Sequence, residues 1–394
     1  MSINSSHKRI SYLLFRIFYT LYHLMMFYLA GSKVDASKSG KDKKTVFICG
    51  IEPENAYSIS RLQWLIGHYQ TADNDYHFVL LSKTVKQVRE ENGYTMVPWE
   101  YQTRARCLGW SGKLFFKQVW TDEQKIIDMA ADCVAMLDMG VEQLSSNIGT
   151  GWTANMLSNM VFAKTFNIPF HIFPQFMGPV IYPKPMHYIL KWMLKVILPS
   201  AASIAVRDAE SRAMVANYVG HDRYQLCLDV LFYPKKTGPA TPSHNALANA
   251  PVKINYAFTE TKSYPSAEQL LNFINSAAAV PIDASHQIPL SQSLHSNAAN
   301  LNSILYVTND YHFMLDVFRS GGLCVFVDAD RQAKSVYELL DAMALAVVTK
   351  DDLSAVLSQL DTIAKLLAKT EELARKIDNF VDHHPLPLPA KHRL

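Results

Sequence analysis

The sequence lacks the short motifs that mark most nucleotide-binding, zinc and serine enzymes. Its 394 residues contain no Walker loop, no GxGxxG, no HExxH and no GxSxG. A glycine-rich cradle for phosphate is therefore excluded, and an anion would have to be bound by cationic side chains and helix N-termini.

Cysteine pairs and a strong net charge are also missing. The five cysteines lie far apart and form no CxxC pair, so we expect reduced, buried thiols in a cytosolic setting, with neither a disulfide framework nor a metal site. The net charge is only +3 and the basic residues are scattered, which argues against a nucleic-acid partner. With 49% apolar and 19% charged residues, the composition is typical of a folded enzyme with room for two domains.

The sequence does contain a long apolar segment near its N-terminus. Residues 10–30 read ISYLLFRIFYTLYHLMMFYLA, about the length that crosses the hydrocarbon of a bilayer, and seven of them are Phe or Tyr. Arg9, Arg16 and His23 are spaced seven apart and would form one basic stripe on a helix, which favours a helix lying in the headgroup plane. Two alternatives stay open: a helix that spans the membrane, and a core helix of a soluble fold.

A lysine-rich linker follows at residues 31–44. Its positive charge would be attracted to anionic lipid, and in a spanning protein it would place the body on the cytoplasmic side. We therefore expect membrane association through residues 10–30 and a cytoplasmic body.

The rest of the chain alternates between short apolar runs and amphipathic stretches, which predicts an α/β fold with parallel, doubly wound sheets. We expect an N-terminal lobe at 45–236, an interlobe linker at 237–250, a C-terminal lobe at 251–380 and a tail at 381–394. Strands are predicted at 45–51, 77–82, 133–140, 169–175, 202–208, 252–258, 303–310 and 323–329. Helices are predicted at 59–69, 85–91, 122–131, 152–166, 186–198, from 209, and at 267–274, 311–320, 334–342 and 351–380.

Three predicted strand ends carry side chains suited to an anionic substrate. Arg207 and Asp208 end one strand where a helix begins. At such a position a guanidinium can bind an anion bidentately, or it can form an internal ion pair. His312 opens the helix after another strand, where it could serve as an acid or anion donor, or merely cap or pack. Lys334 follows the next strand, although a solitary Lys is usually solvated surface. Together they predict a cleft for a small anion.

The order of the short motifs resembles that of the polysaccharide pyruvyl transferases. PQFMGP, SIAVRDAES and DVLF, between residues 174 and 232, are similar to the family's GQ-x-x-GP turn, VRD-x-x-S junction and D-x-x-F element. YVTNDYHF is placed like the family's SRLH motif, SGGLCVFV like its A-x-G-x-P-x-I strand, and Lys334 like the lysine that follows. MLDMGVEQL occupies the place of the family's Gly-rich segment.

This resemblance implies two Rossmann-like lobes, as in GT-B glycosyltransferases. It also implies transfer of pyruvate from phosphoenolpyruvate, the donor substrate, to two hydroxyls of a sugar in a surface-polysaccharide intermediate, with no cofactor. The acceptor would be a glycan or a lipid-linked sugar. Arg207 would bind the donor, His312 would be the acid or a phosphate ligand, and Lys334 would assist. Asp208 and Asn309 are further substrate-binding candidates.

Two positions depart from the family pattern. Asp310 stands where SRLH has its arginine, and of the Gly-rich segment only Gly140 remains, with Asp138 nearby. Negative charge at these positions would repel a trianionic donor. Two other functions therefore stay open: a GT-B glycosyltransferase that holds a nucleotide sugar through Asp310 or Glu338, and a non-catalytic relative that acts as a scaffold.

Overall fold

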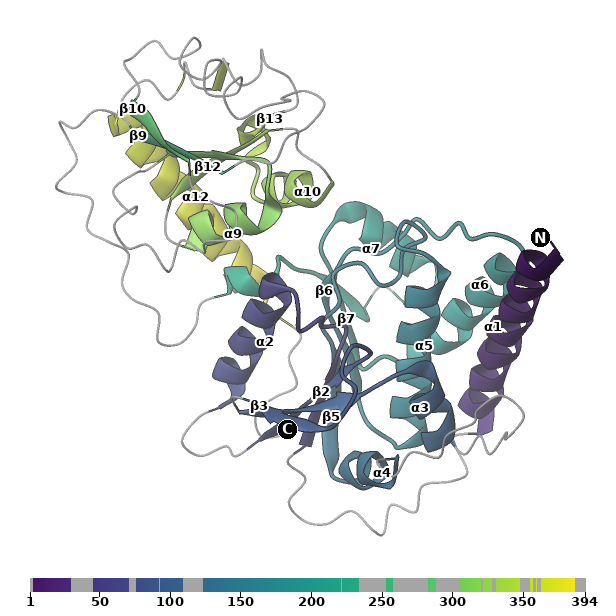
Figure 1. Ribbon diagram of the computed structural model, residues 1–394. Coiled ribbons are helices and arrows are strands. Elements are labelled where there is room, and N and C mark those ends of the chain that lie inside the picture. Colours follow the sequence, from purple (N-terminus) through teal and green to yellow (C-terminus); the bar gives the residue numbers. More distant parts are fainter. Residues whose placement is uncertain are drawn as a thin grey trace. The chain divides into compact units, whose positions relative to one another are not determined.

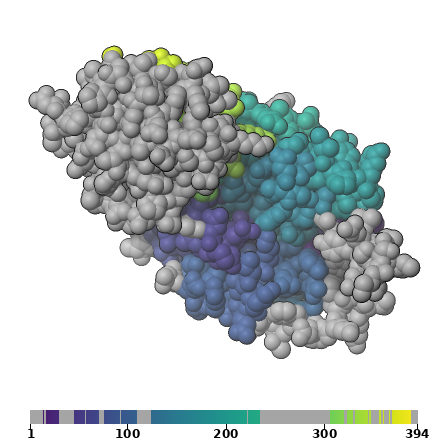
Figure 2. Space-filling view, turned by 45° about the horizontal axis from the view of Figure 1, so that its top comes forward, coloured from purple at the N-terminus to yellow at the C-terminus, as the bar shows by residue number. Residues whose placement is uncertain are grey.

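The computed structural model describes residues 3–29, 45–70, 76–91, 93–108, 123–220, 222–233, 253–257, 283–287, 305–319, 322–327, 331–347, 355–356, 359 and 363–386. The predicted linkers at 31–44 and 237–250 and the predicted helix at 267–274 lie outside these residues. The chain divides into two compact units, Met1–Val230 with Leu386–Leu394, and Leu231–Pro385. In the space-filling view, the described residues of the first unit form a continuous surface coloured from blue-purple to teal (Figure 2).

The first unit is built on an eight-stranded sheet in the order β3-β4-β2-β1-β5-β6-β7-β8. Only β3 runs antiparallel, against β4, and the other neighbours pair in parallel. The run β4-β2-β1-β5-β6-β7 is the dinucleotide-fold order, in which the direction of winding reverses beside β1. The strands are β1 Thr45–Cys49, β2 His77–Ser82, β3 Arg89–Glu91, β4 Tyr94–Pro98, β5 Cys133–Asp138, β6 Phe170–Gln175, β7 Ser203–Val206 and β8 Tyr224–Leu226.

Helices cover both faces of this sheet, as continuous apolar strands such as TVFIC in β1 require. In Figure 1, α2 lies on one side of the sheet, and α5, α6 and α1 lie on the other. The helices are α1 Ile3–Leu29, α2 Ala56–Tyr69, α3 Tyr101–Cys107, α4 Glu123–Ala131, α5 Thr150–Thr165, α6 Met186–Ile197 and α7 Ala209–Ala216.

The N-terminal helix α1 forms an extra layer outside α5, against which it packs, and it also contacts α6. Eleven of the 16 residues of α5 are buried, because the sheet covers one side of this helix and α1 covers the other. Leu24 and Phe27 on α1 are buried, and the Lys164 ammonium of α5 lies 3.6 Å from the centre of the Phe27 ring. One face of α1 therefore belongs to the core of the first unit.

The basic stripe predicted on α1 is wrong at His23, whose side chain is completely buried. Its Nδ1 is 2.8 Å from the Tyr19 carbonyl oxygen. Burial, assisted by the nearby Arg104 charge, lowers the pKa of His23 to about 3, so the ring is neutral at physiological pH. Among the described helices, none is long and apolar enough to cross a bilayer.

The second unit contains a five-stranded parallel sheet in the order β10-β9-β11-β12-β13. This is the flavodoxin-like order, again doubly wound. Its strands are β9 Lys253–Ala257, β10 Asp283–Gln287, β11 Leu305–Thr308, β12 Leu323–Val327 and β13 Ala346–Val347; its helices include α9 Tyr311–Arg319, α10 Arg331–Leu339 and α12 Ile363–His383. The predicted α/β class with mostly parallel sheets is confirmed.

The helix predicted at residues 85–91 is wrong. Residues Arg89–Glu91 form β3, which pairs with β4. Gly93 lies between the two strands. Gly93 has a φ of +85°, a conformation that favours glycine. The buried run of β4 provides a pairing partner, so sheet formation overrides the helix propensity of the Gln, Arg and Glu residues.

Candidate functional site

A small pocket lies at the carboxyl ends of β1, β2 and β4, next to the point where the sheet reverses its winding. Ligands of open α/β sheets bind at this place. The pocket has a volume of about 50 Å³, enough for roughly three to five waters or for one phosphate or carboxylate group. Its lining includes Cys49, Gly50, Glu52, Ser82, Lys83, Trp99, Arg104, Gln143, Trp152, Asn155 and Asn159.

Arg104, on α3, is the buried cation of this pocket, with only 3% of its surface exposed. Its Nη2 donates to Asn155 Oδ1 at 2.6 Å, and its Nη1 donates to Asn159 Oδ1 at 3.3 Å and to the Trp99 carbonyl oxygen at 3.4 Å. Its Nε donates to the Tyr19 hydroxyl of α1 at 3.4 Å. All four acceptors are neutral, and no carboxylate in the described part of the chain forms an ion pair with Arg104. The charge is held in place but not neutralised.

Lys83 adds a second cation at the mouth of the pocket. Its Nζ lies 3.3 Å from the centre of the Trp152 ring and 3.2 Å from Glu52 Oε1. The side chain is 43% exposed, so this ion pair is screened by water and contributes little to stability. With Arg104, Lys83 and Glu52 charged, the pocket carries one net positive charge and suits an anion.

Gly50 shapes the floor of the pocket. It has a φ of +80°, and a Cβ atom there would lie 2.5 Å from both Gln143 Nε2 and the Gly140 backbone nitrogen. Asp138 accepts from that Gly140 nitrogen at 2.9 Å, and from Gln175 Nε2 at 3.4 Å. Burial raises the pKa of Asp138 to about 6, although these hydrogen bonds oppose the shift. Asp138 therefore supports the backbone beneath the pocket.

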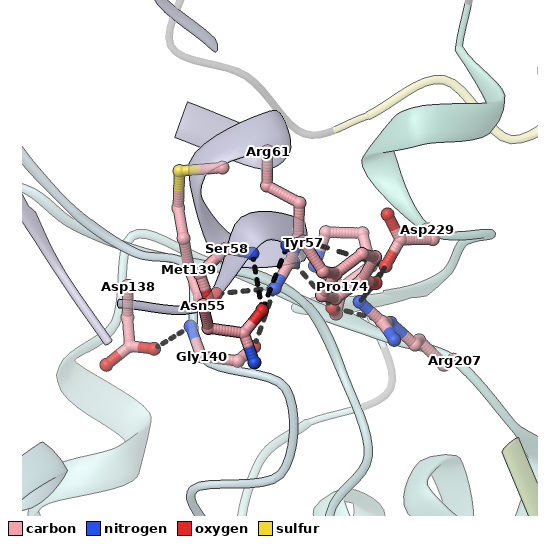
Figure 3. Close-up of polar contacts among 10 residues, drawn as sticks. All are labelled: Asn55, Tyr57, Ser58, Arg61, Asp138, Met139, Gly140, Pro174, Arg207 and Asp229. Carbon is pink, nitrogen blue, oxygen red and sulfur yellow. Dashed lines mark hydrogen bonds and ion pairs between the residues drawn. The ribbon is translucent and has the colours of Figure 1, made fainter. Parts of the chain in front are cut away.

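Arg207, the predicted donor-binding residue, lies in a different and fully buried network (Figure 3). Its Nη2 forms an ion pair with Asp229, and its Nε donates to the Pro174 carbonyl oxygen at 2.8 Å. The Tyr57 hydroxyl donates to the same Asp229 carboxylate, and Arg207 Nη2 is 3.2 Å from that hydroxyl. The internal ion pair that the sequence left open is thus present, but its partner is Asp229 and not the adjacent Asp208.

A second arginine, Arg61 of α2, completes this network. Its Nε is 3.8 Å from Asp229 Oδ2, and its guanidinium donates to the carbonyl oxygens of Met139 at 2.5 Å and Pro174 at 3.3 Å. The start of the loop after β5 and the end of β6 are therefore tied to α2 and to the segment after β8.

Asp208 and Ser211 of the VRD-x-x-S motif also have structural contacts. Asp208 caps α7 by accepting from the Ser211 backbone nitrogen at 2.7 Å. The Ser211 hydroxyl in turn accepts from the Met177 backbone nitrogen at 2.7 Å, within PQFMGP. Three motifs far apart in the sequence, PQFMGP, VRD-x-x-S and DVLF, thus meet in one buried network.

The remaining predicted residues lie in the second unit. His312 is exposed at the start of α9, Asn309 is half-buried just before it, and Lys334 is half-buried on α10. Asp310 Oδ1 accepts from the Phe313 backbone nitrogen at 2.8 Å and caps α9. The aspartate that replaces the family's arginine therefore has a structural role.

Arg104 and Lys83 were not predicted from the sequence. Lys83 directly follows the strand predicted at 77–82, a position that could have identified it. Arg104 gave no such signal, because α3 is a seven-residue helix and its asparagine partners come from α5, about 50 residues further along.

Several solved structures are similar to the chain. The wall teichoic acid polymerase TagF matches with 11% identity and a TM-score of 0.42, covering 94% of this chain and 93% of that one. HepE of Anabaena, in complex with UDP, matches with 9% identity and a TM-score of 0.49, covering 86% and 95%. The calicheamicin glycosyltransferase CalG4 matches with 10% identity and a TM-score of 0.44, covering 86% and 94%. A search of curated protein sequences gives no significant match.

The sequence profile of the polysaccharide pyruvyl transferases matches residues 90–313. This range includes Arg104, Arg207, Asp229 and His312, whereas Lys83 and Lys334 lie outside it. The match covers more than half of the 394 residues and confirms the resemblance seen in the motif order. The chain belongs to the polysaccharide pyruvyl transferase family, a family of transferases.

Proposed function

We propose that this protein transfers pyruvate from phosphoenolpyruvate to two hydroxyls of a sugar in a surface-polysaccharide intermediate. The family supports the reaction class. The observation that carries the choice of an anionic donor is Arg104, a buried cation with no carboxylate partner among the residues that the structure describes, in a pocket at the end of a parallel sheet. A buried charge of this kind is stabilised by a ligand of opposite charge.

The pocket would take one anionic end of the donor. Arg104 would hold a phosphate or carboxylate group through charge-assisted hydrogen bonds, with Lys83 at the mouth as a second contact. Because Asn155, Asn159 and Trp99 fix the guanidinium, little side-chain entropy is lost when the anion binds.

The chemistry requires a proton at the methylene carbon of the donor. In our proposal His312, given the acid's role by its place in the motif order, protonates C3, one sugar hydroxyl adds to C2, and the C2–O bond to phosphate then breaks. The second hydroxyl adds to C2 and closes the ketal. One hydroxyl proton returns to His312 and the other leaves with the phosphate, so the histidine is regenerated.

Arg207 has a different role in this scheme from the one its motif implies. Its ion pair with Asp229 and its hydrogen bond to Pro174 hold the end of β6 against the segment after β8, so we assign it to positioning. Lys334, Asn309 and Asp208 stay candidates for binding the substrate, and Asp208 acts through the cap of α7.

The test is phosphate release from phosphoenolpyruvate in the presence of a panel of polyprenyl-linked hexoses, with mass spectrometry of the sugar product. We expect release that depends on both substrates and is lost in His312→Ala and Arg104→Gln. Arg106→Gln is the matched control, because Arg106 lies on the same helix but pairs with Glu123 at 2.7 Å.

The same panel distinguishes the alternatives. Sugar transfer from UDP-, GDP- or CDP-linked donors, without phosphate release from phosphoenolpyruvate, would replace the proposal with the glycosyltransferase. A folded protein whose melting temperature responds to none of these donors would favour the scaffold.

A further inference from the structure

The outer face of α1 carries a continuous stripe of large apolar side chains. The stripe has six members, which are between 40% and 62% exposed. Five of them are spaced three or four residues apart and the sixth directly follows the fifth, so they lie along one side of the helix. They are Leu14, Phe18, Leu21, Met25, Tyr28 and Leu29. The opposite face of the same helix is packed on α5 and α6.

The neighbouring helix α6 also presents aromatic residues to solvent, and these are accompanied by lysines. Tyr188 is 61% exposed and Trp192 is 48% exposed, and Lys191 and Lys195 are exposed on the same side of the helix. Lys184, just before α6, lies 5.9 Å from the centre of the Tyr188 ring.

Neither helix contains a carboxylate. The 27 residues of α1 and the 12 residues of α6 include no Asp or Glu. Because α1 contacts α6 and the two helices lie side by side (Figure 1), their outer faces form a surface that is apolar, aromatic and positively charged. We call this surface the α1–α6 face.

We propose that the α1–α6 face docks in the plane of a bilayer that contains anionic lipid. The apolar stripe would enter the boundary between headgroups and acyl chains, with Trp192 and Tyr188 at the headgroup level and the lysines on lipid phosphates. This docking does not depend on which reaction the protein performs.

Charge favours lipid over a second copy of the chain. A symmetric dimer through the α1–α6 face would bring the lysines of both copies into one interface, with no carboxylate on either helix to pair with them, and like charges at an interface are costly. Burial favours docking over crossing, because α1 keeps Leu24 and Phe27 in the protein core and cannot be surrounded by lipid without exposing α5.

The test is co-sedimentation of the full chain with vesicles of phosphatidylcholine alone or with 30% phosphatidylglycerol. We expect binding to the anionic vesicles that weakens as salt increases. The double variant Lys191→Glu/Lys195→Glu should reduce binding at least tenfold, and Phe18→Ser/Met25→Ser should do the same through loss of apolar area.

Two matched variants control for general effects of surface changes. Met343→Ser removes an exposed apolar side chain from the second unit, and Lys125→Glu reverses an exposed charge on α4; both should bind like the wild type. Brominated lipid should also quench the fluorescence of Trp192. The quenching should therefore be smaller in Trp192→Phe, a result that would place the α1–α6 face toward the lipid.

Three outcomes would overturn the proposal. The first is no binding to either vesicle by a protein whose near-ultraviolet circular dichroism shows a native fold. The second is equal loss of binding in the controls. The third is a dimer in sedimentation equilibrium that Phe18→Ser/Met25→Ser dissociates, which would assign the face to a second copy.

Discussion

Arg207 and Arg104 are both buried arginines near the carboxyl edge of the same sheet, yet their surroundings differ in charge. Arg207 pairs with Asp229, which it shares with Arg61 and Tyr57. Arg104 is held by two asparagines, a carbonyl and a tyrosine, all neutral. Arg207 has a carboxylate partner inside the fold, which it shares with Arg61, whereas Arg104 has only neutral partners among the described residues and lines a pocket.

The difference shows how a motif residue and a binding residue can be told apart. An arginine with a buried carboxylate partner stabilises the arrangement of the segments around it, and its removal should affect folding. An arginine without a counterion contributes less to folding, because its charge is costly to bury, and its removal should affect ligand binding. The first two of the four predictions below test this division, and the other two test how burial acts on two further titratable groups.

The largest effect is expected for Asp229→Asn. This change leaves Arg207 and Arg61 buried without a carboxylate, so the free energy of unfolding should fall by about 3 to 5 kcal/mol. This free energy can be measured by urea unfolding with tryptophan fluorescence as the signal. The signal reports on the first unit, because all six tryptophans lie at or before residue 192. A loss below about 1 kcal/mol would mean that the ion pair does not stabilise the fold.

Arg104→Gln should separate binding from folding. We expect an affinity for inorganic phosphate lowered by about 10- to 100-fold, as for the loss of one charge-assisted hydrogen-bond partner. The free energy of unfolding should change by less than in Arg207→Gln. Calorimetric titration and urea unfolding measure the two quantities, and equal destabilisation by the two substitutions would remove the distinction between the arginines.

The pH dependence of stability tests the burial of His23 on the inner face of α1. Burial lowers the pKa of His23 to about 3, so the unfolded chain binds a proton below its ordinary pKa of 6.5 while the folded chain does not. The stability contribution is therefore lost as the pH falls, by about 2 kcal/mol between pH 7 and pH 5. Unfolding of wild type and His23→Gln at both pH values should show this loss only in the wild type.

Asp138 should show the opposite trend, by a smaller amount. Its pKa is raised by burial to about 6, so the folded chain binds a proton that the unfolded chain releases. Stability should rise by about 1 kcal/mol between pH 7 and pH 5, and Asp138→Asn should lack this rise. A parallel response of Asp138 and His23 to pH would contradict the assignment of their surroundings.

Much of the fold could be predicted because its strands are continuous apolar runs. HFVLLS and FHIFPQ were located closely, and the burial of all five cysteines as thiols followed from their dispersal. The family also followed from the order of motifs around VRD and DVLF. Short elements whose stability comes from tertiary contacts, such as β3 and α3, could not be predicted from local pattern.

The candidate site was harder to predict than the fold. A VRD motif shows an arginine at a strand end, but it cannot show that this arginine pairs with Asp229, 22 residues later. The sequence also cannot show that Arg104 has only neutral partners among the described residues, because those partners come from distant parts of the chain. Whether an arginine has a carboxylate partner can be seen only in the folded chain.

The layer that α1 forms over α5 also has a consequence for the timing of folding. Residue 29 leaves the ribosome about 120 residues before residue 150, an interval of roughly 6 to 24 s at ordinary rates of synthesis. During this interval the inner apolar face of α1 has neither α5 nor the completed sheet to pack against. A nascent chain beside a membrane would therefore have both faces of this helix available to lipid first, and would transfer one face to protein only after α5 emerges.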